Sequence, residues 1–279
     1  MKRITGLFLV GAAMLLLNGA VTVRAEVSEA DQIVLRGQYV KKVLIFRKSF
    51  RVLGHLEVNE DGSVAGNPKP GFWSMDGACQ VQDVAFRSDR VTVKCAKLWA
   101  NVKGDGQLHY FPASAALKGK SGYPESIDVV FKTGKSTMSA GDFKDRVSQI
   151  FLGEGESLLS VTPAPIAAYI QSVPIEPDID PANGKRFDGT PPKAISTPSP
   201  GLSREAALVG QAGKEDFIAL VDKQGRASVM GFTHILQYGL EETTMEAVKG
   251  WKFQPAMKDG KPVAVRMAME VEYKHPNTK

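Results

Sequence analysis

The sequence predicts an α+β protein with two folded parts and a proline-rich segment between them. Three observations support this interpretation. Residues 32–159 carry repeated β-branched and aromatic runs separated by turn residues. Residues 161–200 contain nine of the chain's 16 prolines. The last part of the chain has helix and strand periodicities in the order helix, strand, strand, helix, strand. We therefore divide the chain into residues 1–25, 26–160, 161–200 and 201–279.

The first 25 residues have the pattern of a secretory signal peptide. A basic start precedes an uninterrupted apolar run over residues 7–17, and residues 23–25 read Val-Arg-Ala, a small-x-small pattern before a cleavage point. An uncleaved membrane anchor is the alternative, because residues 4–23 are mostly apolar and could just span a bilayer. In both cases we expect an exported protein, located in the periplasm and held at the inner membrane only if the segment stays attached.

Export changes the meaning of the basic composition. The full chain has a formal net charge of +5, but Lys2, Arg3 and Arg24 all lie in the predicted signal, which holds no acidic residue. Its removal would leave a net charge of +2. A nucleic-acid or anionic-membrane partner is therefore not indicated.

The region 26–160 is predicted to be a mostly antiparallel β domain with one helix. Its expected strands fall within residues 32–40, 42–58, 78–86, 90–102, 107–113 and 126–133. Ser139 can cap the one expected helix, with Asp142 in its first turn and Phe143, Val147 and Ile150 at helical spacing.

Two cysteines lie on neighbouring predicted strands of this domain. Cys79 and Cys95 flank a turn near Ser88-Asp89 and can face the same core. Because an exported protein meets oxidising conditions, we predict a structural disulfide between them. A redox pair is the alternative, but the short Cys-x-x-Cys spacing typical of one is absent.

The region 161–200 is predicted to be an extended linker. Prolines at this density block helices and sheet ladders and favour a stiff spacer. The expected consequence is that the two flanking domains work at a distance from each other.

The C-terminal region predicts a compact α+β unit. Helices are expected over residues 203–212 and 241–250, and a hairpin turns at Lys223-Gln224-Gly225. Residues 261–273 predict a long final strand that either sits centrally or leaves an edge unpaired. The residues expected on one face of that strand are Val263, Val265, Met267, Met269, Val271 and Tyr273.

The sequence offers little support for catalysis. His55, His109, His234 and His275 are scattered without metal-ligand spacing, and no serine or cysteine has a nucleophile motif around it. We therefore predict no catalytic residues, no metal site and no cofactor.

One long motif points to a family. The stretches "FIALVDKQGRASVMGF" and "GLEETTMEAVKGWKFQPAMKDGKPVAVRMAMEVEY" strongly resemble the C-terminal domain of energy transducer TonB proteins, over about residues 191–275. Members of this family commonly carry a proline-rich segment before the domain, as this chain does. The residues that carry the motif are Ala247, Val248, Trp251, Phe253, Pro255, Ala256, Gly260, Pro262 and Val263.

The resemblance implies a periplasmic domain with two helices on a three-stranded antiparallel sheet. In the family this domain pairs an edge strand with a short extended segment of outer-membrane TonB-dependent transporters. Transferred to this chain, the expected partner-binding residues are Val263, Ala264, Val265, Arg266, Met267, Ala268, Met269, Glu270, Val271, Glu272 and Tyr273.

Three features depart from the family pattern. The N-terminal segment has a cleavable pattern and lacks an intramembrane histidine. The Tyr-Pro pair often found at the domain entrance is replaced by "PSPGLS", and a β domain stands where a transducer would have only anchor and spacer. Coupling to inner-membrane motor proteins would need residues 1–25 to remain attached. We expect a non-catalytic periplasmic protein that binds transporters or similar extended peptides and can contribute to energy-coupled transport.

A second hypothesis places the activity in residues 26–160. The protein would then be a secreted enzyme or ligand-binding protein with a TonB-like docking module. The support is the size of that domain and a set of aromatic residues, namely Phe72, Trp73, Trp99, Tyr110 and Phe111. Such aromatic side chains more often belong to a hydrophobic core.

Overall fold

The computed structural model describes residues 27–51, 54–102, 107–117, 123–134, 138–179 and 186–275. The predicted signal peptide therefore lies outside the described residues. Within those ranges, none of the helices combines the length and the hydropathy that crossing a membrane requires. The helices are α1 (Glu29–Tyr39), α2 (Trp73–Asp76), α3 (Ala113–Leu117), α4 (Ala140–Ile150), a 3₁₀ turn (Leu158–Ser160), α5 (Ala164–Ile170), α6 (Arg204–Val209) and α7 (Leu240–Lys249).

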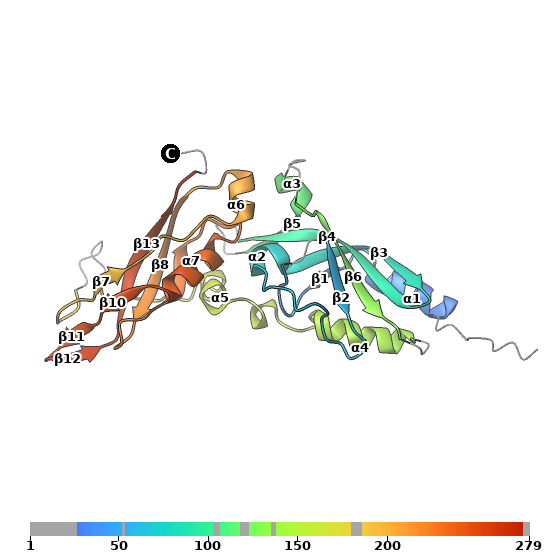
Figure 1. Ribbon diagram of the computed structural model, residues 1–279, viewed down its shortest axis with the longest axis horizontal. Coiled ribbons are helices and arrows are strands. Elements are labelled where there is room, and N and C mark those ends of the chain that lie inside the picture. The colour runs from blue at the N-terminus through green and yellow to red at the C-terminus, as the bar shows by residue number, and fades with distance from the viewer. Residues whose placement is uncertain are drawn as a thin grey trace, which may run out of the picture.

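The strands fall into two groups along the chain. The first group is β1 (Val43–Ile45), β2 (His55–Val58), β3 (Ala78–Arg87), β4 (Arg90–Val102), β5 (Leu108–Pro112) and β6 (Ser126–Lys132). The second group is β7 (Lys193–Ser196), β8 (Gly213–Val221), β9 (Ala227–His234), β10 (Lys252–Gln254), β11 (Ala256–Lys258), β12 (Lys261–Val263) and β13 (Val265–Tyr273). Figure 1 shows the groups at opposite ends of an elongated molecule. We call the described residues of 27–160 the N-terminal lobe and those of 161–275 the C-terminal lobe.

The N-terminal lobe is organised around the long strand β4. Strands β3 and β6 both pair antiparallel with it, β5 pairs antiparallel with its final residues, and β2 pairs with β6 in parallel. Helices α1 and α4 contribute Leu35, Phe143 and Val147 to the core that this sheet builds. Ser139 and Asp142 form the expected capping box of α4, which confirms this helix.

One strand predicted in this lobe is wrong. Residues 32–40 fall in and just after α1, which begins where Ser28 accepts a hydrogen bond from the Asp31 backbone N–H. The run of β-branched residues misled the prediction, because Ile33 and Val34 are 67% and 53% exposed on the outside of the helix. The capping geometry and the burial of Leu35 outweigh strand propensity here.

The proline-rich region also differs from the prediction of an extended spacer. Residues 164–170 form α5, which begins with Pro165 in its first turn, where proline's missing N–H has no consequence. Ile166 is 2% exposed in the core of the C-terminal lobe. Further along, β7 pairs antiparallel with β10. The described parts of this region therefore fold onto the C-terminal lobe.

The C-terminal lobe confirms the predicted α+β arrangement. Its sheet is antiparallel with the strand order β13-β8-β9, so β8 is central and β13 is an outer strand. Phe217, Ala219 and Val221 of β8 are buried in a core with Leu240 and Val248 of α7. Two small two-stranded sheets extend the lobe beyond this sheet: β10 pairs with the distant strand β7, and β11 forms a hairpin with β12.

The lobes are in contact, contrary to the expectation that they work at a distance. Trp73 and Val102 of the N-terminal lobe belong to the same hydrophobic cluster as the C-terminal sheet. The Ser74 backbone N–H donates to Glu242 Oε1 at 3.2 Å, and Gln237 Nε2 donates to the Val102 carbonyl at 3.2 Å. Trp99 and Tyr238 pack edge to face with ring centroids 5.8 Å apart.

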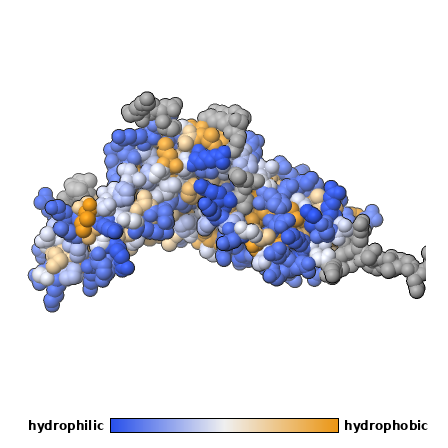
Figure 2. Space-filling model, viewed as in Figure 1, coloured by the Kyte–Doolittle hydropathy of each residue, from blue (hydrophilic) through white to orange (hydrophobic). Residues whose placement is uncertain are grey.

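The surface is largely hydrophilic on the face drawn in Figure 2, with scattered hydrophobic patches. Large hydrophobic side chains exposed in the described part of the chain are Ile33, Val34, Val43, Val173, Ile195 and Met230.

Candidate functional site

The residues of the family motif form the end of α7 and the short strands β10, β11 and β12 that precede β13. Trp251 and Phe253 are 7% and 8% exposed in the C-terminal core, and Trp251 Nε1 donates to the Pro198 carbonyl at 2.9 Å. The Phe253 N–H donates to the Gly225 carbonyl at 2.8 Å. Gly225 has φ +76°, and a Cβ there would lie 1.9 Å from the Phe253 carbonyl oxygen. Only glycine fits this close approach, which links the hairpin turn to the motif.

The second half of the motif forms a tight turn. Asp259 and Gly260 both have positive φ, +51° and +71°, as the two central residues of a type I′ hairpin require. Ala256 pairs with Val263, and Pro262 lies opposite Met257 in this hairpin. The turn therefore reverses the chain directly before β13.

The structure places the predicted partner-binding residues along one outer strand. Val263 ends β12, Ala264 lies between the strands, and the other nine residues, 265–273, form β13. Val265 pairs with Val221 at one end of β13 and Tyr273 with Gly213 at the other.

Alternate residues of β13 serve two different purposes. The side chains of Val265, Val271 and Tyr273 are buried against the helical side of the sheet. The Tyr273 hydroxyl donates to the Leu240 carbonyl at 2.9 Å and lies 2.7 Å from Thr244 Oγ1, so it fixes the strand to α7.

The outer side of β13 is open over part of its length. In an antiparallel pair every second residue directs its backbone N–H and C=O away from the partner strand. The bond from the Ala268 N–H to the Ile179 carbonyl shows that the even-numbered residues point outward. Glu270 and Glu272 have the same parity, and their outward backbone groups have no backbone partner among the described residues.

The first part of that edge is occupied by the chain itself. The Asp178 and Ile179 N–H groups both donate to the Arg266 carbonyl, at 2.9 and 3.0 Å. The Arg266 N–H donates to Asp178 Oδ2 at 2.9 Å, and its Nη2 donates to Oδ1 at 2.8 Å. The hydrogen bond from Arg266 lowers the pKa of Asp178. The linker interpretation missed this contact, and no local sequence signal points to it.

A second unexpected feature is a buried carboxylate behind the strand. Glu215 of β8 is fully buried, with Oε2 accepting from Thr244 Oγ1 at 2.6 Å and Oε1 from the Leu236 N–H at 3.2 Å. Burial is the main cause that raises the pKa of Glu215 to about 7. Strand parity could have found it, because Glu215 shares the core-facing parity of Phe217 and Ala219.

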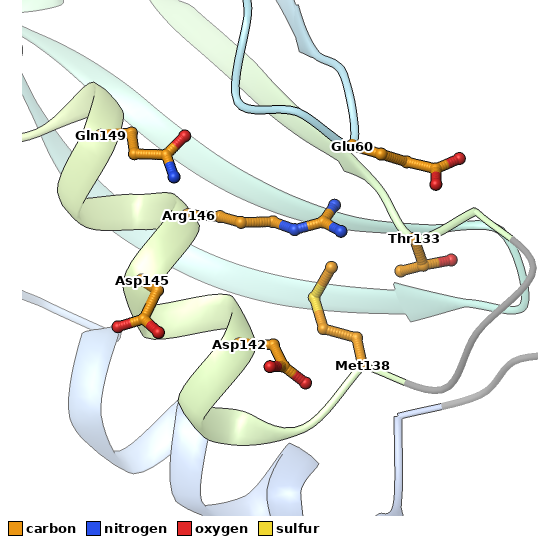
Figure 3. A pocket seen from close by; sticks show the side chains of 7 residues that line it. All are labelled: Glu60, Thr133, Met138, Asp142, Asp145, Arg146 and Gln149. Atoms are coloured by element: carbon orange, nitrogen blue, oxygen red, sulfur yellow. The ribbon is translucent and has the colours of Figure 1, made fainter.

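The N-terminal lobe contains a polar hollow of about 330 Å³ beside α4. Figure 3 shows Arg146 extending from the helix between Glu60 and Thr133. The Arg146 guanidinium donates to the Lys132 carbonyl, and Asp142 at the rim is engaged in the capping box. Thr133 Oγ1 is buried without a hydrogen-bond partner among the described residues. The Arg146 guanidinium, the positive group among these residues, is thus already bonded to a backbone carbonyl. The described residues of this hollow therefore do not indicate which ligand it could bind.

The aromatic residues of the second hypothesis lie in or against the hydrophobic cores. Trp99 is fully buried and packs edge to face on Phe111, and Trp73 lies at the contact between the lobes. Within the described ranges, no group of three or more histidine, cysteine or acidic side chains could hold a metal ion.

The cysteines differ from the prediction. Both are fully buried, and both are free thiols. In the β3–β4 ladder Cys79 lies opposite Lys97 and Cys95 opposite Val81, so the two are diagonal neighbours. Their side chains are close enough to interact, because the Cys95 thiol is one of the causes that raise the pKa of Cys79.

The fold and the open edge define a small α+β domain with an outer strand available for pairing. Residues 198–275 match the family model described as Gram-negative bacterial TonB protein C-terminal. A solved structure, the solution NMR structure of the Pseudomonas aeruginosa TonB CTD, is 19% identical, covers 33% of this chain and 95% of that chain, and has a TM-score of 0.26. No curated protein matches the chain. The family-model match shows that the chain carries a TonB-like C-terminal domain over residues 198–275, which confirms the resemblance inferred from the motif.

Proposed function

We propose that this protein is a non-catalytic periplasmic protein of the energy-transducer kind. Its C-terminal lobe binds outer-membrane TonB-dependent transporters, or similar extended peptides, by pairing an incoming strand with the outer edge of β13. The family match over residues 198–275 and the outer position of β13 support this proposal.

The observation that carries the proposal is the row of outward backbone groups at Glu270 and Glu272. Strand addition obtains affinity from main-chain hydrogen bonds and needs no special side chains on the receiving edge. That requirement agrees with a strand whose exposed side chains are ordinary charged residues. Lys214 Nζ and Glu270 Oε1 lie 2.9 Å apart and form an exposed ion pair between β8 and β13. This pair involves side chains and not the outward backbone groups of β13.

Location and energy coupling depend on residues 1–25. The signal-like pattern supports export to the periplasm, and direct coupling to inner-membrane motor proteins requires the segment to remain attached. Mass spectrometry of the native N-terminus distinguishes the two versions: a mature chain that starts at Glu26 would be an adaptor without motor coupling through this segment.

The binding test uses one position on the outer edge. Glu270→Pro removes an outward N–H that makes no described backbone bond, and an edge strand can accept proline's φ. Glu270→Ala is the matched control, because it loses the same side chain and keeps the N–H. The probe is a purified TonB-dependent transporter from the same bacterium, held in detergent with its periplasmic N-terminal segment intact.

We expect the wild type and Glu270→Ala to bind the transporter with similar affinity. Glu270→Pro should bind at least about tenfold more weakly, which corresponds to ~1.4 kcal/mol. Circular dichroism checks that both variants remain folded. Equal binding by the two variants would place the contact elsewhere, and no binding by the wild type would overturn the proposed function.

A further inference from the structure

A short stretch of the proline-rich region lies on the strand that the proposed function assigns to a partner. We call residues 175–179 the strap. Ile179 forms a parallel bridge with Met267, at the centre of the first half of β13. The Arg266 N–H, the Arg266 carbonyl and the Ala268 N–H all bond to Asp178 or Ile179. These three groups are the outward-facing backbone groups from the Arg266 N–H to the Ala268 N–H, and all of them are bonded to the strap.

The strap reaches this position along a defined path. Helix α5 packs against β9, the outer strand on the opposite side of the sheet. A Cβ on Gly231 of β9 would lie 2.5 Å from Ile175 Cδ1, so the strap runs close over this strand before it meets β13. Asp178 then forms a forked ion pair with Arg266, with side chains 37% and 38% exposed. The segment therefore connects the two outer strands of the sheet.

We propose that the strap is an internal occupant of the partner-binding edge, and that an incoming strand pairs with the full length of β13 only after the strap has left. This inference rests on the proposed function. The physical reason is exclusion, because a backbone N–H or carbonyl that serves Asp178 or Ile179 cannot at the same time serve a second strand on the same side. Binding would thereby be regulated by the equilibrium between a closed and an open edge.

The contacts suit a reversible occupant. The ion pair is partly exposed, and exposed ion pairs contribute little to stability. Within the strap, only Asp178 and Ile179 make backbone hydrogen bonds to β13, so few bonds break when the strap leaves. Its tether keeps it near the edge, and a tethered segment competes at a high effective concentration. A closed fraction of about nine-tenths would weaken the apparent affinity for a partner about tenfold.

The test uses the full chain with a reversible lock. Ile179→Cys with Met267→Cys places two thiols at the bridged positions and closes the edge when oxidised. The matched control is Leu220→Cys with Ser228→Cys, directly paired residues of β8 and β9 whose bond leaves the outer side of β13 open. Cys79 and Cys95 are fully buried and stay out of the exchange. A third variant, Asp178→Ala, loosens the strap. The probe is the purified transporter of the previous test, with the dissociation constant as the readout.

We expect the oxidised lock to bind at least about tenfold more weakly than its reduced form. The control should bind equally in both redox states, and Asp178→Ala should bind more tightly than the wild type. Equal binding by the oxidised and reduced lock would overturn the strap inference and leave the proposed function standing. Absence of binding by the wild type would overturn the proposed function, and this inference with it.

Discussion

At the scale of single residues, the C-terminal lobe contains a group of buried carboxyl side chains whose burial costs folding free energy when they are charged. Glu215 and Glu241 are 0% and 3% exposed, and Glu242 accepts hydrogen bonds from Ser74 in the other lobe. Burial is the first cause that raises the pKa of each of the three. Glu241 Oε2 has no hydrogen-bond partner among the described residues. The charged forms of these side chains therefore oppose folding.

Glu215→Gln should relieve part of this opposition. The folded protein holds a proton on Glu215 up to about pH 7, whereas the ordinary pKa of this group is 4.5. Between these two values the folded state binds more protons than the unfolded state, so the free energy of unfolding falls as pH rises. We expect Glu215→Gln to match the wild type at pH 5 and to be more stable at pH 8, on the order of 2 kcal/mol.

Thermal unfolding at the two pH values measures this difference. Glu246→Gln is the control, because Glu246 lies on α7 with its side chain 77% exposed, and its replacement should leave the stability nearly unchanged at both pH values. A Glu215→Gln variant that is less stable than the wild type at pH 8 would show that the carboxylate is needed in its charged form.

The cysteines give a second test at this scale. Burial and the neighbouring Cys95 thiol raise the pKa of Cys79 well above its ordinary value, so little reactive thiolate is present. We expect negligible labelling by a thiol reagent in the native protein and two labelled thiols in denaturant without reductant. Failure to label in denaturant until a reductant is added would show a disulfide.

At the scale of elements, α5 is the least expected feature, and its packing can be measured. Ile166 is 2% exposed, and removing its side chain leaves a cavity in the C-terminal core. We expect Ile166→Ala to lower the free energy of unfolding by about 2–4 kcal/mol. Val173→Ala, in the same proline-rich region but 50% exposed, should change it by less than about 0.5 kcal/mol. An extended spacer would make both changes neutral.

Elements with strong local signals could be predicted from the sequence. Helix α4 has its capping box, α7 has its apolar face, and β13 has alternating apolar residues. Helix α7 lies within one residue of its expected limits, whereas the final strand is predicted from residue 261 and β13 begins at Val265, because β12 and Ala264 interrupt the predicted run. Helix α1 could not be predicted, because its outer face carries β-branched residues that favour a strand when read alone. The strap could not be predicted either, since its partners on β13 lie far away along the chain.

At the scale of the whole molecule, the contact between the lobes is the feature that sequence reasoning missed. Trp73 and Val102 resemble ordinary core residues of a β domain, and nothing local shows that they face another lobe. The ion pair between Arg51 and Glu205 adds little to the stability of this contact, because Arg51 Nη2 and Glu205 Oε2 are 4.0 Å apart. The described contact therefore consists mainly of hydrophobic packing around Trp73 and Trp99, with hydrogen bonds from Ser74 to Glu242 and from Gln237 to the Val102 carbonyl.

Trp73→Ala should uncouple the lobes. We expect a loss of about 3 kcal/mol in the free energy of unfolding and a single calorimetric transition in the wild type that separates into two in the variant. Val43→Ala, 43% exposed on a strand of the same lobe, is the control and should leave the transition unchanged. Two transitions already in the wild type would mean that the lobes unfold independently.

The partial coverage of β13 has a consequence for solubility. An uncovered outer strand recruits other copies of the same chain and so seeds aggregation. Here the strap bonds to the first half of β13, so this strand does not offer its whole length to a neighbouring copy. The same residues that restrict access for a partner therefore also protect a concentrated solution of this protein from joining sheet to sheet.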